Sequence, residues 1–203
     1  MRVFGIDPGS ERTGYGCVDS DGRRHRLVLC GAIRAGVGAT FPDQLSIIYR
    51  SLTKLLTEHR PECVVIENVF HAVNARSALK LGHARGVAML AAVEAGMEVF
   101  EYTPAEVKRA VVGYGRAEKP QVGQMVKLLL GLDKVPTPHD ASDALAVAIC
   151  HLHRCGAKID RVYLSAGKPA KNRPDLFLPP GRKTPGVLKS WRQYKPPVRA
   201  TRP

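Results

Sequence analysis

The chain has 203 residues, 44% of them hydrophobic, which is enough for a packed core in one domain with an appendage or in two small domains. Its formal net charge is +13, from 31 Lys and Arg against 18 Asp and Glu. No apolar run approaches the ~18 residues that span a membrane. The first residues lack the pattern of a secretory signal, and the five cysteines form no C-x-x-C pair. We therefore expect a cytoplasmic protein with reduced thiols and no membrane partner.

The positive charge is concentrated near the end of the chain. Residues 156–203 contain 12 Lys and Arg, eight of the 15 prolines, and only Asp160 and Asp175 as acids. Such a composition does not easily build a core. We predict a globular domain over 1–155 and a basic, Pro-rich, flexible tail over 156–203. The tail either attracts a polyanion such as nucleic acid or only keeps the protein soluble.

The first part of the chain predicts three consecutive strands, over 2–7, 14–22 and 24–35. The short Asp-Ser-Asp-Gly turn between the second and third strands indicates an antiparallel hairpin. An amphipathic helix follows over 42–59, where leucine and isoleucine recur at spacings of three and four residues.

From residue 63 the chain alternates between strands and helices. The strands cover 63–68 and 97–103. The helices cover 74–95, a segment that starts at Thr103-Pro104, 121–131 after a glycine-punctuated loop over 113–121, and 140–155, which we expect Gly156 to end. This order predicts an α/β fold, in which a mixed sheet has helices on its faces.

Four acids lie at the ends of predicted strands and helices, where active sites of α/β folds usually form. Asp7 ends the first strand and Glu67 the fourth, while Asp140 and Asp143 share one side of the last helix at its start. If the two strands are parallel neighbours and the helix begins beside them, the four carboxylates converge. Their repulsion calls for protons or metal. Mg²⁺ or Mn²⁺ fits oxygen ligands, and two such ions can hydrolyse a phosphodiester.

Each acid also has a purely structural interpretation. Asp7 begins a common Asp-Pro-Gly turn, and Glu67 is compatible with a solvated strand end. Asp140 and Asp143 suit the first turn of any helix, because the helix dipole favours acids there.

Four segments together resemble one known family. They are GIDPGSERTGYG (5–16), IENVFHAVNARSALKLGHARGVA (66–88), FEYTPAEVKRAVVGYGRAEKPQV (100–122) and HDASDALAVAICH (139–151). They are similar to the RuvC family of bacterial crossover junction endodeoxyribonucleases, which resolve Holliday junctions. The tail lies outside the resemblance, which gives it no role.

The resemblance implies a ribonuclease-H-like fold with a five-stranded sheet, a homodimer, and paired symmetric nicking of four-way junction DNA in recombination and repair. Asp7, Glu67, Asp140 and Asp143 occupy the catalytic metal-binding positions of the family, which imply two Mg²⁺ ions per active site, with Mn²⁺ as a substitute. Cooperation with the branch-migration proteins RuvA and RuvB is a further implication.

Several basic and aromatic residues are candidates for DNA contacts. Lys108 and Lys119 match basic positions that the family uses at the DNA backbone, although a single lysine is otherwise most simply a solvated charge. Arg76 and Lys80 share one face of the 74–95 helix and are weaker candidates. Phe70 either stacks on a base beside the scissile phosphate or belongs to the core.

Two further features of the sequence have open interpretations. His139 precedes Asp140 and either assists a metal-bound water or leaving group or simply begins the helix. Gly82 and Gly86 make one face of the 74–95 helix flat, which suits either a dimer interface or packing on the sheet.

Two other classes of protein are alternatives to a nuclease. An actin-like or sugar-kinase-like ATPase also places an Asp before a glycine-rich turn, but it usually needs a second domain. A nucleic-acid-binding module with degenerate acids is disfavoured because all four acids are intact.

Overall fold

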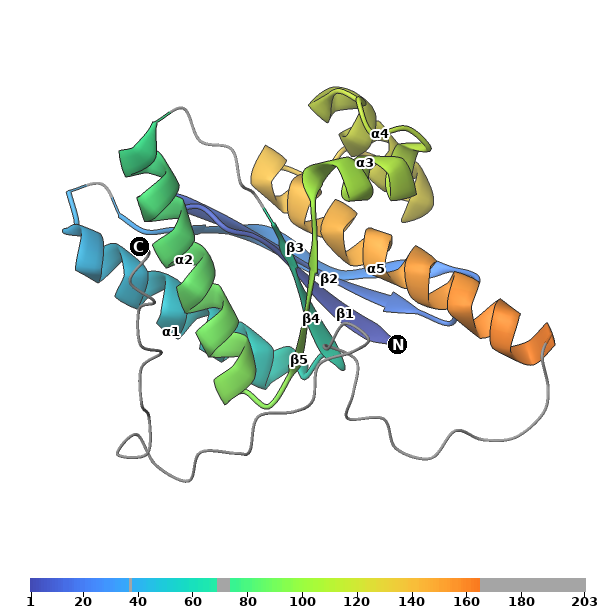
Figure 1. Ribbon diagram of the computed structural model, residues 1–203, viewed down its shortest axis with the longest axis horizontal. Coiled ribbons are helices and arrows are strands. Elements are labelled where there is room, and N and C mark those ends of the chain that lie inside the picture. The colour runs from blue at the N-terminus through green and yellow to red at the C-terminus, as the bar shows by residue number, and fades with distance from the viewer. Residues whose placement is uncertain (37, 69–73, 165–203) are drawn as a thin grey trace, which may run out of the picture. The chain divides into compact units, whose positions relative to one another are not determined.

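Five strands form one mixed sheet in the order β3-β2-β1-β4-β5 (Figure 1). The computed structural model describes residues 1–36, 38–68 and 74–164, the last nine as backbone only. The strands are β1 Arg2–Asp7, β2 Arg12–Ser20, β3 His25–Arg34, β4 Cys63–Glu67 and β5 Glu98–Tyr102. The first three strands pair antiparallel, whereas β4 runs parallel to both β1 and β5. The predicted mixed sheet is confirmed.

The helices cover both faces of this sheet. One layer holds α1 and α2, and the other holds α5 with α3 and α4 beside it (Figure 1). Their bounds are α1 Phe41–His59, α2 Ala75–Glu94, α3 Pro104–Val112, α4 Lys119–Leu129 and α5 His139–Leu164. None of the described helices is long and apolar enough to cross a membrane.

The central strands are apolar because both of their faces are covered. Successive side chains of a strand point to opposite faces. On β1, Phe4 and Ile6 therefore join the buried cluster with α1 and α2, whereas Val3 joins the cluster with α5. This explains why β1 and β4 show a continuous hydrophobic run instead of alternation.

Two glycines let α5 approach the backbone of the sheet. A Cβ on Gly14 of β2 would lie 2.0 Å from the carbonyl oxygen of Asp140, and one on Gly5 of β1 would lie 2.0 Å from that of Ala144. No side chain fits at these distances, so only glycine permits the contact. The first turns of α5 are thereby held beside the carboxyl end of β1.

Two predicted helix boundaries are wrong. α5 does not end at Gly156 but continues to Leu164, so residues 156–164, which composition assigns to the tail, are helical. A glycine costs a helix about 1 kcal/mol relative to alanine and does not by itself stop it. α4 begins at Lys119 rather than at residue 121, because Pro120 suits a first turn and Gln121 accepts a hydrogen bond from the backbone N–H of Glu118. Residues 165–203 lie outside the described part.

We predict that Gly14→Ala destabilises the protein. The added methyl group must push α5 away from β2, and such overpacking typically lowers the free energy of unfolding by about 1–3 kcal/mol. Urea denaturation measures this change. Gly115→Ala is the control, because a Cβ there lies no closer than 3.4 Å to another residue. Equal stability of both variants would show that α5 does not pack closely against the backbone of β2.

Candidate active site

A rigid turn presents Asp7 at the end of β1. The buried hydroxyl of Thr13 donates a hydrogen bond to the carbonyl oxygen of Gly9 at 2.7 Å and accepts one from the Gly9 N–H at 3.4 Å. A Cβ on Gly9 would lie 2.2 Å from the carbonyl oxygen of Arg12. The Pro8-Gly9 turn is thus clamped against the start of β2, which leaves the Asp7 carboxyl group in a defined position.

Asp7 and Glu67 lie next to each other, as the parallel strands predict. Ile6 of β1 is in register with Ile66 of β4, and the carboxyl groups of the following acids are hydrogen-bonded to each other. Burial raises the pKa of Asp7 to about 8, and the charges of Glu67 and Asp143 add to this effect. Burial also raises the pKa of Glu67. The two acids therefore share a proton near neutral pH.

Asp143 reaches the same pocket from α5. Its Oδ2 accepts a hydrogen bond from the Lys119 Nζ at 2.8 Å, and this bond is the main reason why the pKa of Lys119 is raised. The pocket has a volume of about 340 Å³. Its lining includes Asp7, Glu67, Lys108, Lys119 and Asp143.

Asp140, three residues before Asp143 on α5, does not line this pocket. Its Oδ2 is 3.3 Å from an Nη1 of Arg12, and it lines a neighbouring groove of about 810 Å³ instead of the pocket itself. Three of the four predicted acids thus line one pocket, whereas the fourth, Asp140, forms an ion pair with Arg12. Sequence reasoning missed Arg12, although its place just after the Asp7 turn was a usable signal.

The donor chemistry of the pocket fits a divalent metal. Carboxylate oxygens are the ligands that Mg²⁺ and Mn²⁺ prefer, and a cation would relieve the repulsion that keeps a proton on the Asp7–Glu67 pair. Within the described ranges, however, no three His, Cys, Asp or Glu side chains are already arranged to hold a metal. The ion pairs of Lys119 with Asp143 and of Arg12 with Asp140 must open before all four carboxylates can share an ion.

The other predicted residues do not line the pocket or lie outside the described part. Phe70 belongs to the undescribed segment 69–73. Arg76 is exposed in the first turn of α2, and Lys80 lies with its Nζ 5.6 Å from the centre of the Phe41 ring. His139 is the exposed first residue of α5.

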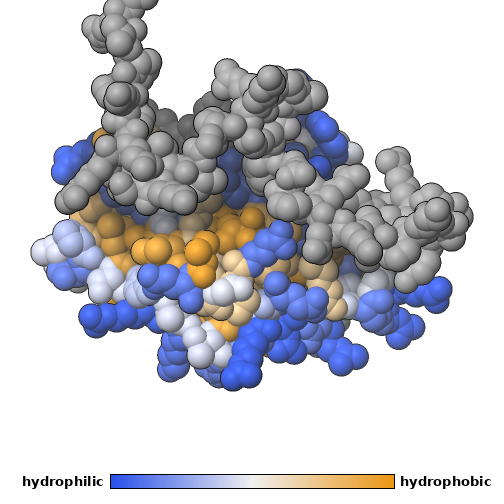
Figure 2. Space-filling model, turned by 60° about the horizontal axis from the view of Figure 1, so that its bottom comes forward, coloured by the Kyte–Doolittle hydropathy of each residue, from blue (hydrophilic) through white to orange (hydrophobic). Residues whose placement is uncertain are grey.

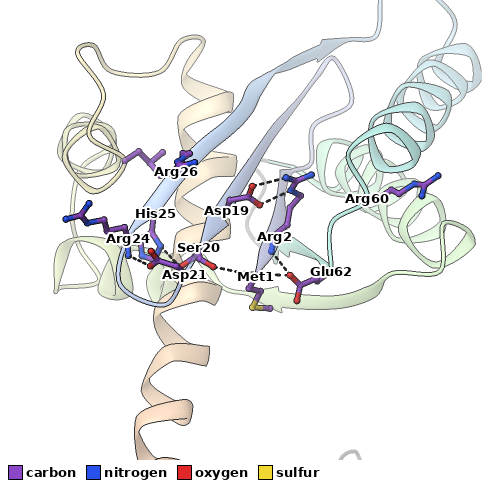
Figure 3. Close-up of a pocket in the computed structure, with 11 residues that line it drawn as sticks. Met1, Arg2, Asp19, Ser20, Asp21, Arg24, His25, Arg26, Arg60 and Glu62 are labelled. Carbon is purple, nitrogen blue, oxygen red and sulfur yellow. Dashed lines mark hydrogen bonds and ion pairs between the residues drawn. The ribbon is translucent and has the colours of Figure 1, made fainter.

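A second hollow, of about 780 Å³, lies at the opposite end of the sheet (Figure 3). Its acids already have partners. The Arg2 guanidinium donates to both oxygens of Asp19 at 2.8 Å, and the terminal ammonium group of Met1 is 3.6 Å from Glu62. Asp21 accepts hydrogen bonds from two backbone N–H groups of the turn. This hollow therefore does not resemble the carboxylate pocket at the other end of β1.

Residues 3–151 match a family model described as crossover junction endodeoxyribonuclease RuvC. The chain belongs to the RuvC family. A RuvC protein of Koribacter versatilis is 54% identical over 167 residues, which cover 82% of this chain and 100% of that protein. One from Alkalilimnicola ehrlichii is 56% identical over 153 residues, or 75% of this chain and 92% of that protein.

Solved RuvC structures share the fold. The Thermus thermophilus RuvC structure is 34% identical, has a TM-score of 0.72, and aligns over 78% of this chain and 97% of its own. The same protein in complex with Holliday junction substrate has a TM-score of 0.74, with 34% identity over 78% of this chain and 96% of its own. RuvC membership confirms the ribonuclease-H-like fold and the endonuclease class, and it implies divalent metal dependence. The ATPase alternative is wrong.

We predict that the metal-free protein loses stability as the pH rises from 5 to 8. Because the pKa of Asp7 is raised on folding, the folded protein binds more protons than the unfolded chain between about pH 4 and pH 8, and its unfolding free energy falls with rising pH. One proton held only by the folded protein lowers the unfolding free energy by up to about 1.4 kcal/mol per pH unit, and each kcal/mol corresponds to roughly 2–4 °C in Tm for a protein of this size.

Thermal denaturation in a chelator measures this slope. Asp7→Asn should flatten it and raise the Tm at pH 8, whereas Asp133→Asn, which alters an exposed acid outside both the pocket and the groove, should leave it unchanged. A wild-type Tm that rises with pH over this range would contradict the shared proton.

Proposed function

We propose that this RuvC-family protein resolves four-way DNA junctions by paired symmetric nicks, in recombination and repair in the cytoplasm. The observation that supports this most is the pocket at the end of β1 and β4, in which Asp7, Glu67 and Asp143 face Lys108 and Lys119. Acids that can hold hard metal ions, with lysines beside them that can bind phosphate, suit the hydrolysis of a phosphodiester.

Asp7, Glu67, Asp140 and Asp143 are the proposed ligands of two Mg²⁺ ions, for which Mn²⁺ can substitute. Bound there, such ions supply an activated water and stabilise negative charge on the reacting phosphate. The proton shared by Asp7 and Glu67 must leave for both to act as ligands. Lys119, once released from Asp143, is placed to hold a phosphate oxygen at the pocket.

The remaining predicted DNA contacts keep the roles that the sequence suggests. Lys108 lines the pocket and is proposed to bind the DNA backbone. Phe70, Arg76 and Lys80 are proposed to contact DNA beside the cut, and His139 to assist proton transfer. Cooperation with RuvA and RuvB stays a prediction.

An exposed apolar stripe on α2 supports a homodimer. Leu79 (65% exposed), Leu90 (51%) and Val93 (62%) follow one side of the helix, with Gly82 and Gly86 between them. A Cβ on either glycine would meet no described atom within 4 Å, so packing on the sheet does not explain this face. An apolar area bordered by hydrophilic side chains is also visible on one face of the molecule (Figure 2).

A two-fold dimer also fits the substrate. A four-way junction has approximate two-fold symmetry, and a dimer built on one self-complementary patch carries two identical active sites. Two nicks in strands of like polarity then follow from the symmetry of the assembly.

We predict that cutting of a synthetic four-way junction requires Mg²⁺ or Mn²⁺ and that Asp7→Asn lowers its rate by about 10³-fold or more, as removal of a group at the reacting centre typically does. Denaturing gels of strand-labelled junctions measure the nicks. Linear duplex and Asp133→Asn serve as the control substrate and variant. Tight junction binding without cutting under either metal would favour a binding module and overturn the proposal.

We predict that Leu90→Glu converts the dimer into a monomer, because a charge in the apolar stripe would be buried without a partner in the interface. Light scattering coupled to gel filtration measures the mass. Leu128→Glu, at a residue on α4 that is 69% exposed, is the matched control and should stay dimeric. A wild-type monomer at micromolar concentration would rule out this interface.

A further inference from the structure

The groove beside Asp140 continues the candidate active site on the side away from the lysines. Asp140 lines this groove, and Asp143, three residues later on α5, lines the pocket that also contains Lys108 and Lys119. The lining of the groove consists of Glu11, Arg12, Arg34, Gly36, Gly38, Gln44 and Asp140.

Two arginines face each other in this groove. Arg12 of β2 pairs in register with Arg34 of β3, so their side chains leave the same face of the sheet at neighbouring positions. Two like charges in such a pair repel each other and destabilise the sheet. Arg12 has Asp140 as a partner, but Arg34 forms no ion pair within the described residues. Glu11 lies nearby and is paired with neither arginine there.

The resulting order of charges across the end of the sheet suits a DNA strand. Two arginines come first, then the carboxylates, and then two lysines. A strand that lays its scissile phosphate on the carboxylates has further phosphates on both sides of it, which basic side chains can bind. The lysines provide these on one side only.

Arg12 also controls where the Asp140 carboxylate points. Its Nη1 lies 3.3 Å from the Oδ2 of Asp140, and both residues line the groove instead of the pocket. A cation that recruits Asp140 to the other acids must compete with Arg12. Once this single contact from Nη1 to Oδ2 opens, the Arg12 guanidinium is free to donate hydrogen bonds to a phosphate, whose geometry its planar fork matches.

We propose that this groove is a second binding site for the DNA backbone, in which Arg34 and Arg12 hold phosphates of the cleaved strand, and that Arg12 exchanges Asp140 for a phosphate when metal and DNA bind. The proposal rests on the junction-cleaving function above. It makes Arg12 a positioning residue with two opposite effects: it weakens metal binding to the free protein and strengthens DNA binding.

The first test is a calorimetric titration of the free protein with Mn²⁺. Arg12→Gln should bind Mn²⁺ about 1.4- to fivefold more tightly than wild type, because an exposed ion pair worth roughly 0.2–1 kcal/mol no longer competes. Weaker Mn²⁺ binding by Arg12→Gln, in a variant with unchanged Tm, would mean that Arg12 supports Asp140 as a ligand and would overturn the exchange.

The second test is the salt dependence of junction binding, measured with Mn²⁺ in an Asp7→Asn background so that no strand is cut. Arg12→Gln and Arg34→Gln should each weaken binding and reduce the slope of log affinity against log salt by about 1, the loss of one phosphate contact. Arg12→Lys should keep the slope because it retains the charge.

Arg24→Gln is the matched control for the salt test, because Arg24 is an exposed arginine at the opposite end of the sheet (Figure 3). Its slope should equal that of wild type. Unchanged slopes for Arg12→Gln and Arg34→Gln, in a protein whose wild type cuts junctions, would overturn the groove as a phosphate site. Failure of the wild type to cut or bind junctions would instead overturn the proposed function.

Discussion

The contact between α5 and the backbone of the sheet is the constraint on which the candidate site depends. At Gly5 and Gly14 the strands lack the Cβ that would keep the carbonyl oxygens of Ala144 and Asp140 at a distance. The helix therefore lies directly on β1 and β2, and its first turns bring Asp140 and Asp143 to the end of β1. A larger side chain at either glycine would separate the acids of the helix from those of the sheet.

That proximity has an electrostatic consequence. Ionising both Asp7 and Glu67 is unfavourable because they are largely buried and close together, so the pair retains a proton. Lys119 and Arg12 form ion pairs with the acids of α5, Asp143 and Asp140. The protein thus balances the charges of Asp140 and Asp143 with its own cations. The same cations are the groups that a polyanionic substrate needs, so binding of metal and binding of DNA are coupled through shared ion pairs.

Sequence patterns predicted much of this arrangement because they report local chemistry. An apolar strand that ends at Asp7 before a Pro-Gly turn, and a second that ends at Glu67, indicated acids at one edge of a sheet, and the strand register agrees. The prediction that Gly156 ends α5 was wrong because helix propensity is a weak preference. The position of Arg34 in the groove could not be predicted from its neighbours in the sequence, because it depends on the pairing of Arg34 with Arg12 on the adjacent strand.

The sequence by itself determined the order of strands and helices, the family, and which four acids are candidates for catalysis. The order of the elements and the acids at strand ends depend on periodicity and turn chemistry, which act locally, whereas the family was indicated by the resemblance of four separate segments to RuvC. Only the tertiary structure decided that Asp140 faces Arg12 instead of the other acids. Those two residues are 128 positions apart, and their contact exists only because α5 rests on the glycines of the sheet.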